Sequence, residues 1–294
     1  MSSLRKYKIE PKYLLNSALN LFRSKKIKTI VVEGVSDKKF LSQWEKRESP
    51  IRFDGLDGKR LVEKVYGESR SKPYIDYDFL YFFADVDYDA VAKLGLHIHP
   101  KFIYNAYCFN SENLIYNDLE IFLVNTSSLG KVLANHDISI NEVDGIRERL
   151  ELASRKIGAF RAADILLQKR EGLTTSILNG IEVSEFFDPV KIDINVDFLK
   201  SRIPYWTSKK YLVQDLVEVA EKTNFGWPAL WSLSRGHDVT EMIYLHLESK
   251  GFKGLNSSKI ELMLRLACES NDYRCSPMGQ KLIKADPECL LELN

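Results

Sequence analysis

Two short, largely apolar runs dominate the hydrophobic pattern of the first hundred residues. Residues 27–32 read IKTIVV and lead into Glu33, and residues 79–84 read FLYFFA and lead into Asp85. Short runs without polar alternation are typical of strands that are buried on both faces of a parallel sheet. We therefore predict two central strands, at residues 27–33 and 79–84.

Segments with helical spacing alternate with these strands. Apolar residues recur at i, i+4 and i+7 positions in residues 10–24, and Phe40, Leu41 and Trp44 share one face of a predicted helix at 36–46, with Ser36 as its N-cap. Further patterns predict short strands near 51–53 and 102–104 and a helix at 58–67. Strands that alternate with helices in this way predict an α/β fold, in which helices flank a parallel sheet through right-handed crossovers.

The second half of the chain has mainly helical periodicity. We predict one long charged helix or a pair at 142–170, and helices at 209–223, 238–250 and 258–270, with Asp238 as an N-cap. Residues 180–207 contain two prolines and short apolar runs, so we predict irregular structure there. The chain is therefore expected to form an α/β domain at 1–130 and a mostly helical portion at 131–294.

Composition and charge narrow the class of protein. The 294 residues include 42 Lys+Arg and 41 Asp+Glu, and the resulting net charge of +1 does not indicate a uniformly basic nucleic-acid binder. The four cysteines show no CxxC spacing and are expected to be free buried thiols. The amino terminus has no apolar core of the signal-peptide type, and no apolar stretch is long enough to span a membrane. We expect a cytoplasmic protein with no membrane partner.

Carboxylates gather where the two central strands are predicted to end. Glu33 follows the first strand, and Asp85 and Asp87 follow the second. Open α/β sheets build their sites at the carboxyl ends of strands, and carboxylates that converge there favour a divalent cation. Asp85 and Asp87 would point to the same side if the strand continued. These residue types predict a Mg²⁺ site, with Mn²⁺ as an alternative, suited to attack on a phosphodiester.

Other readings of these acids stay open. Asp85 and Asp89 could cap a following helix, and Glu33 could pair with a lysine. Ser111 is a predicted N-cap that places Glu112 in the first turn of a helix, where the helix dipole stabilises a carboxylate. A DxD after a strand is also found in haloacid-dehalogenase-like phosphatases and in nucleotide-sugar glycosyltransferases. Asp89 is therefore a metal ligand or a cap, and a phosphatase is an alternative activity.

Basic residues near the predicted strand ends are candidate phosphate contacts. Lys38 follows the first strand, and Lys59 and Arg60 lie in the turn DGLDGKR. Solvated lysines would explain these positions equally well. Several basic residues of the long helix could track an RNA backbone, although a charged, solvated helix face also explains them; they are Arg155, Lys156, Arg161, Lys169 and Arg170.

Three segments together resemble the Toprim-like proteins, and most closely their DUF4435 branch: EGVSDKKF at 33–40, DVDYD at 85–89 and FNSENLI at 109–115. By position, the resemblance implies that Glu33 is a general acid/base or a metal ligand, and that Asp85 and Asp87 are a metal pair. Asp37 and Glu112 match further acids of the DUF4435 pattern. A long glycine-rich turn after Glu33 is absent, so tyrosine chemistry of the topoisomerase kind is not expected.

The same resemblance implies an activity and partners. It implies a Mg²⁺-dependent nuclease of the Toprim family that acts as a toxin in anti-phage defence and cleaves host RNA, with tRNA favoured. The active form is expected to be a homodimer that is released from an ABC-type ATPase subunit. Two alternatives remain: a catalytically silent Toprim-like interaction module of an ATPase complex, and a phosphatase of the DxD type.

Overall fold

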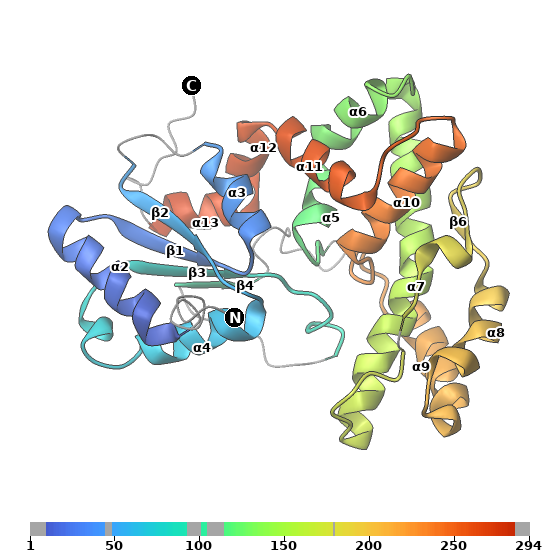
Figure 1. Cartoon of the computed structure of the whole chain (residues 1–294), viewed down its shortest axis with the longest axis horizontal. Helices are drawn as coiled ribbons and strands as arrows, with labels where there is room; N and C mark the ends of the chain where they lie inside the picture. Colours follow the sequence, from blue (N-terminus) through green and yellow to red (C-terminus); the bar gives the residue numbers. More distant parts are fainter. Residues whose placement is uncertain (1–9, 45–48, 93–100, 105–114, 179, 286–294) are drawn as a thin grey trace. The chain divides into compact units, whose positions relative to one another are not determined.

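The computed structural model describes residues 10–44, 49–92, 101–104, 115–178 and 180–285 (Figure 1). The chain forms two compact units. The first, called here the sheet unit, comprises the described residues within Met1–Asp85, Leu96–Ala106 and Tyr273–Asn294. The second, the helical unit, comprises those within Val86–Gly95 and Tyr107–Asp272.

A four-stranded parallel sheet forms the centre of the sheet unit. Its order is β2-β1-β3-β4, and the strands are β1 (Lys28–Val32), β2 (Ile51–Gly55), β3 (Leu80–Ala84) and β4 (Phe102–Tyr104). Ile30 of β1 pairs with Phe53 of β2 and with Tyr81 of β3. Every residue of β3 is buried, as expected for a strand covered on both faces. The predicted α/β class and its parallel sheet are confirmed.

Helices cover both faces of this sheet. Figure 1 shows α3 (Val35–Ser42) and α13 (Pro277–Ala285) on one face, with α2 (Pro11–Lys25) and α4 (Lys59–Ser69) on the other. The apolar positions of α2 and α4 that face inward are buried, as the periodicity predicts. They are Leu14, Leu15, Ala18, Leu19, Val62, Val65 and Tyr66. A short 3-10 turn, η1 (Tyr74–Asp76), precedes β3.

The predicted N-cap of the helix after β1 is wrong by two residues. Gly34, not Ser36, is the N-cap of α3, and the Asp37 carboxylate accepts the Gly34 N–H at 2.8 Å. A second glycine, Gly55 at the end of β2, lies against this turn. A Cβ on Gly55 would lie 2.6 Å from the Gly34 carbonyl oxygen, so the close approach of β2 to this turn leaves room only for glycine at position 55.

The carboxy-terminal segment returns to the sheet unit. Tyr273, in α12 (Ser270–Cys275), stacks on Trp44 at a centroid distance of 5.2 Å and contacts Phe40 edge-on at 6.1 Å. This contact covers the apolar face of α3, which must be buried against another element. The two units do not follow a single boundary such as the predicted one at residue 130: the chain leaves the sheet unit after Asp85 and again after Ala106, and the described residues from Tyr273 belong to the sheet unit.

The helical unit is built around one long helix, α7 (Val143–Glu171), as the charged pattern at 142–170 predicts. Residues 180–207 were predicted to be irregular, but 196–206 form a helix that accommodates Pro204 and is capped by the Asn195 side chain. The other helices of this unit are α5 (Leu119–Val124), α6 (Ser127–Ala134), α8 (Val196–Trp206), α9 (Val213–Gly226), α10 (Gly236–Ser249) and α11 (Ser257–Ala267). Short elements complete it: η2 (Ile140–Glu142), η3 (Val183–Glu185), η4 (Lys210–Leu212), and the antiparallel pair β5 (Phe187–Asp188) and β6 (Asp193–Ile194).

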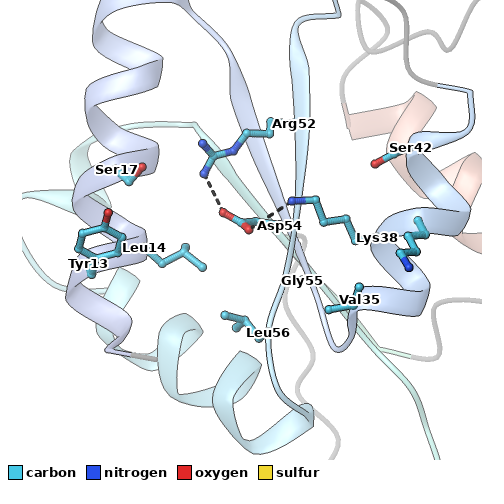
Figure 2. Close-up of a pocket in the computed structure, with 11 residues that line it drawn as sticks. Tyr13, Leu14, Ser17, Val35, Lys38, Ser42, Arg52, Asp54, Gly55 and Leu56 are labelled. Atoms are coloured by element: carbon cyan, nitrogen blue, oxygen red, sulfur yellow. Dashed lines mark hydrogen bonds and ion pairs between the residues drawn. The ribbon is translucent and has the colours of Figure 1, made fainter. Parts of the chain in front are cut away.

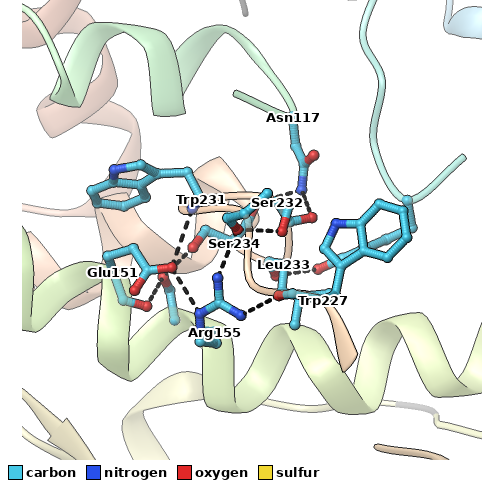
Figure 3. Close-up of polar contacts among 11 residues, drawn as sticks. Asn117, Glu151, Arg155, Trp227, Trp231, Ser232, Leu233 and Ser234 are labelled. Atoms are coloured by element: carbon cyan, nitrogen blue, oxygen red, sulfur yellow. Dashed lines mark hydrogen bonds and ion pairs between the residues drawn. The ribbon is translucent and has the colours of Figure 1, made fainter. Parts of the chain in front are cut away.

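A buried polar network fixes the loop at 227–235 against α7 (Figure 3). The Arg155 guanidinium donates to the Glu151 carboxylate at 2.8 Å and to the carbonyls of Trp227 and Ala229 at 2.8 and 2.7 Å. Glu151 also accepts the Trp231 N–H at 3.1 Å. These charge-assisted bonds satisfy backbone groups that would otherwise be unpaired in the interior.

The basic residues of α7 are held by acids of the same unit. Arg161 makes a bidentate pair with Asp238 at 2.7 and 2.8 Å, and Lys156 contacts Asp193 at 2.5 Å. Arg170 pairs with Asp215 and Glu171. Together with Arg155, which binds Glu151, four of the five basic residues predicted as possible RNA contacts therefore have acidic partners within the unit. These ion pairs favour the alternative of a charged helix face over a path for RNA.

Two remaining expectations concern cysteines and the membrane. Cys268 is buried as predicted, whereas Cys275 is exposed; Cys108 and Cys289 lie outside the described residues. None of the described helices is both long and apolar enough to cross a lipid bilayer.

Candidate functional site

The candidate site lies at the carboxyl ends of β1 and β3, the two central strands. From β1 the chain first adds β2 on one side and then returns to place β3 on the other side. The strand order therefore reverses between β1 and β3, and open α/β sheets bind ligands at this point, outside the carboxyl ends of the strands. Glu33 directly follows β1, and Asp85 directly follows β3.

Hydrogen bonds join the two strand ends. The Glu33 carboxylate accepts the backbone N–H of Asp85 at 2.8 Å. The Glu33 carbonyl accepts the N–H of Gly58, in the turn before α4, at 3.0 Å. Both acidic side chains are half-buried. Glu33 and Asp85 thus lie close together at one edge of the sheet, as predicted.

A lysine occupies the same edge. The Lys59 ammonium donates to the Asp85 carbonyl at 2.6 Å, because α4 begins at Lys59 and its first turn faces the end of β3. Lys59 was predicted to contact substrate phosphate. Its position places a positive charge beside the acids, while Arg60, predicted for the same role, is exposed one residue further on.

The second aspartate of the DVD motif does not continue the strand. Asp87 has a φ of 51°, in the left-handed region, and is exposed. The N–H groups of Val86 and Asp87 both bond to the Asn117 carbonyl at 3.0 Å. The premise that Asp85 and Asp87 point to one side by strand alternation is therefore wrong, because the chain turns at Val86. The division between the units falls between Asp85 and Val86, so the motif belongs to both.

The remaining residues predicted for the site are Asp37, Asp89, Glu112 and Lys38. Asp37 accepts the Gly34 N–H and so caps α3, which gives it a structural role whether or not it binds a metal. Asp89 is half-buried, and its N–H donates to the Val86 carbonyl at 3.1 Å. The residues that directly follow it, up to Ala92, form a turn and not a helix. Glu112 lies outside the described residues. Lys38, a predicted phosphate contact, lies 3.8 Å from Asp54.

The acids present fit a hard divalent cation that keeps several water ligands. Among the residues that the structure describes, no three His, Cys, Asp or Glu side chains are grouped to hold a metal ion. Mg²⁺, however, is commonly bound by one or two carboxylates together with water and substrate phosphate oxygens. Glu33 and Asp85 supply two such carboxylates at one edge, so their chemistry is compatible with Mg²⁺ and does not form a closed protein cage.

Sequence reasoning missed the residues that support the DVD motif. Asn117 also donates through its side-chain amide to the carbonyls of Ser232 and Ser234, at 2.6 and 3.0 Å. Asp118 caps α5 and accepts the Gly236 N–H at 2.7 Å. Burial, with a smaller contribution from the charge of Asp87, raises the pKa of Asp118 to about 6. An aspartate directly before the apolar run LEIFLV is an N-cap signal that was available in the sequence.

A second charged cluster joins α10 and α11. The His237 ring nitrogen Nδ1 lies 2.8 Å from a Glu261 carboxylate oxygen. Their hydrogen bond raises the pKa of His237, while the same bond to His237 lowers the pKa of Glu261 against the opposing effect of burial. Asp238 was predicted to cap this helix. Arg235 is the N-cap instead, and Asp238 binds Arg161 from within the first turn.

The His237–Glu261 pair predicts a pH-dependent stability difference. A raised histidine pKa gives stability that is full below about pH 6.5 and is lost as the pH rises through the folded-state pKa. A lowered glutamate pKa gives stability that is present above about pH 4.5. His237→Gln should therefore lower the free energy of unfolding most between about pH 4.5 and 6.5. The loss should be roughly 0.5–1 kcal/mol, because solvent screens the charge of a side chain that is 59% exposed.

Urea unfolding of both proteins at pH 5.5 and at pH 8.5 would measure this effect. A difference between wild type and His237→Gln that is equal at the two pH values would contradict the pairing.

Comparisons with known proteins leave the family open. No protein-family model matches the chain, and no curated protein matches it in sequence. The resemblance carried by EGVSDKKF, DVDYD and FNSENLI therefore stays a prediction.

Proposed function

We propose that the protein is a Mg²⁺-dependent phosphodiesterase that cleaves RNA at the edge formed by the ends of β1 and β3. The observation that carries this proposal is the hydrogen bond from the Asp85 N–H to the Glu33 carboxylate, at 2.8 Å. It brings two acids from adjacent strands to the point where the strand order reverses. This arrangement supports the reading of the two motifs as parts of one site.

The residues of this edge have distinct roles in the proposal. Asp85 would hold the ion, and Glu33 would either hold an ion or move a proton. Mg²⁺, when bound, supplies Lewis-acid stabilisation of charge on the phosphoryl oxygens. Lys59 adds a fixed positive charge at the same edge and restrains the Asp85 backbone through its 2.6 Å bond. Stabilisation of developing negative charge by such preorganised groups is expected to dominate the rate enhancement.

The substrate and partners follow from the family resemblance. The resemblance extends to AriB, the effector subunit of the PARIS anti-phage system, which pairs with the ABC-type ATPase AriA. By this analogy we propose tRNA as the substrate, a homodimer as the active form, and release from an AriA-like ATPase as the activating step. Asp87, Asp89, Asp37 and Glu112 are further proposed ligands.

Expression in cells without a partner tests this function. The wild-type chain and Glu33→Ala are each expressed, growth is followed, and total RNA is separated on a gel. We expect growth arrest and discrete tRNA-sized fragments with the wild type, and neither with Glu33→Ala. Equal toxicity of both proteins would remove Glu33 from the mechanism.

The two alternative functions predict different results in assays of phosphate release and RNA cleavage. A phosphatase would release inorganic phosphate from small esters and leave RNA intact. A catalytically silent module would leave RNA intact, and its cellular phenotype in the presence of the ATPase would not depend on Glu33.

A further inference from the structure

A groove lies beside the outer strand of the sheet, β2, and none of Glu33, Lys59 and Asp85 lines it. It has a volume of about 680 Å³, which is in the range of roughly 300–1,000 Å³ typical of small-ligand sites. Figure 2 shows its construction: Tyr13 and Ser17 come from α2, Val35 and Lys38 from α3, and the edge strand β2 lies between them. We call it the β2-edge groove.

The groove carries excess positive charge. Lys38, Lys39 and Arg52 line it, and among the described lining residues Asp54 is the one acid. Arg52 donates to Asp54 at 2.7 Å, and Lys38 lies 3.8 Å from the same carboxylate. One carboxylate therefore faces two cations, with Lys39 as a third on the same wall. The groove is suited to an anion that can replace or extend the contacts of Asp54.

The α2 wall, opposite Lys38 and Lys39, contributes an aromatic ring. Tyr13 on this wall is 55% exposed, and it lines the groove together with Leu56, after β2, and Val35, which is 61% exposed on the α3 wall. A half-exposed aromatic ring opposite a row of cations is the combination that binds a nucleotide, because a base stacks on the ring while phosphate oxygens meet the cations.

A peptide strand fits the same groove less well. Added strands bind through the free N–H and C=O groups of an edge strand. The edge strand β2 spans Ile51–Gly55 only, and the Ser49 hydroxyl already accepts the Ile51 N–H at 3.2 Å. The short edge, with one of its N–H groups already bonded, favours a ligand held by side chains over an added strand.

We propose that the β2-edge groove binds a nucleotide, with its phosphate on Lys38, Lys39 and Arg52 and its base against Tyr13. The nucleotide is either a free mononucleotide or one unit of a single-stranded RNA. Binding uses none of Glu33, Lys59 and Asp85 and needs no bond to be cleaved, so the proposal rests on the proposed function only in the choice of RNA as a probe.

Binding is measured with the full-length chain carrying Glu33→Gln, in EDTA, so that no cleavage occurs. The probes are AMP, followed by calorimetry, and a fluorescently labelled single-stranded hexanucleotide RNA, followed by anisotropy. We expect Lys39→Gln to weaken binding about 3- to 10-fold, and Lys39→Gln with Arg52→Gln to reduce the slope of log affinity against log salt by roughly 1.4 for RNA. Tyr13→Ala should weaken binding roughly 5- to 100-fold, and Tyr13→Phe should restore it.

Lys12→Gln is the matched control. It makes the same charge change one residue from Tyr13, at an exposed position of α2 that does not line the groove, and should leave affinity within about twofold. Thermal unfolding of every variant checks that the sheet unit stays folded. Sensitivity of AMP binding to Lys39 and Tyr13 identifies a free-nucleotide site, and sensitivity of RNA binding alone identifies part of a polymer path.

Three results would overturn the proposal: no binding of either probe to the Glu33→Gln protein, equal affinities of the folded Lys39, Tyr13 and Lys12 variants, or a groove that takes an acidic peptide but neither probe. None of these bears on cleavage by the wild-type protein, which is assayed separately. Failure of cleavage with intact nucleotide binding would in turn reject the proposed function and leave the groove assignment standing.

Discussion

Glu33→Gln is expected to lower the rate of RNA cleavage by at least about 10²–10³-fold while the sheet unit keeps its fold. The glutamine carbonyl can still accept the Asp85 N–H, which lies 2.8 Å from the Glu33 oxygen in the structure. The negative charge that would hold a cation or accept a proton is lost. Because the hydrogen bond survives, the substitution separates the chemistry of Glu33 from its part in joining the two strands.

Two further variants complete this comparison. Glu33→Ala removes the acceptor as well as the charge, so it should lose the same activity and in addition about 0.5–1.5 kcal/mol of unfolding free energy. Asp76→Asn makes the same charge change at an exposed position in η1, before the amino end of β3, and should retain wild-type activity. The measurement is single-turnover cleavage of labelled tRNA in Mg²⁺, with urea unfolding in parallel.

The pattern of rates decides between two roles of Glu33. Loss of activity in Glu33→Ala alone, with Glu33→Gln active, would mean that only the hydrogen bond to Asp85 matters and would reject Glu33 as a ligand or proton carrier. Loss in both variants, with Asp76→Asn active, supports a chemical role for the carboxylate.

The sheet and the positions of Glu33 and Asp85 could be predicted because the sequence patterns that define them are local. Strand β3 is apolar at every position, and Glu33 and Asp85 stand directly after strands. Parallel pairing then brings strand ends together without further information. The placement of Asp87 could not be predicted in the same way. Its turn depends on Asn117, thirty residues later in the chain, whose carbonyl accepts the N–H groups of Val86 and Asp87.

The packing of helices and loops in the carboxy-terminal half could not be predicted from local patterns either. The periodicity of α7 predicts a helix, but it cannot predict which loop lies against it. The loop at 227–235 is fixed by bonds from Asn117, Glu151 and Arg155, which come from separate parts of the sequence. The charged residues of α7 predict either a path for RNA or a charged, solvated helix face, whereas Arg155 is almost fully enclosed, with 12% of its side chain exposed.

Gly158→Ala is expected to destabilise the helical unit by more than about 3 kcal/mol. A Cβ at this position would lie 1.5 Å from the Leu233 carbonyl oxygen and 2.6 Å from the carbonyl carbon. The clash is with backbone, so no side-chain rotation relieves it. The loop cannot move away cheaply, because the Asn117 amide holds the carbonyls of Ser232 and Ser234 on either side of Leu233 (Figure 3).

Gly145→Ala on the same helix is the matched control, because a Cβ there meets only the Arg149 side chain at 3.6 Å, an ordinary contact. Alanine is the better helix former, so this change should raise stability by up to about 1 kcal/mol. Urea unfolding followed by tryptophan fluorescence should thus move the two midpoints in opposite directions. Equal midpoints for the two variants would show that the 227–235 loop is not held against Gly158. Opposite shifts would locate the constraint in the close approach of Leu233, because both substitutions add the same methyl group to the same helix.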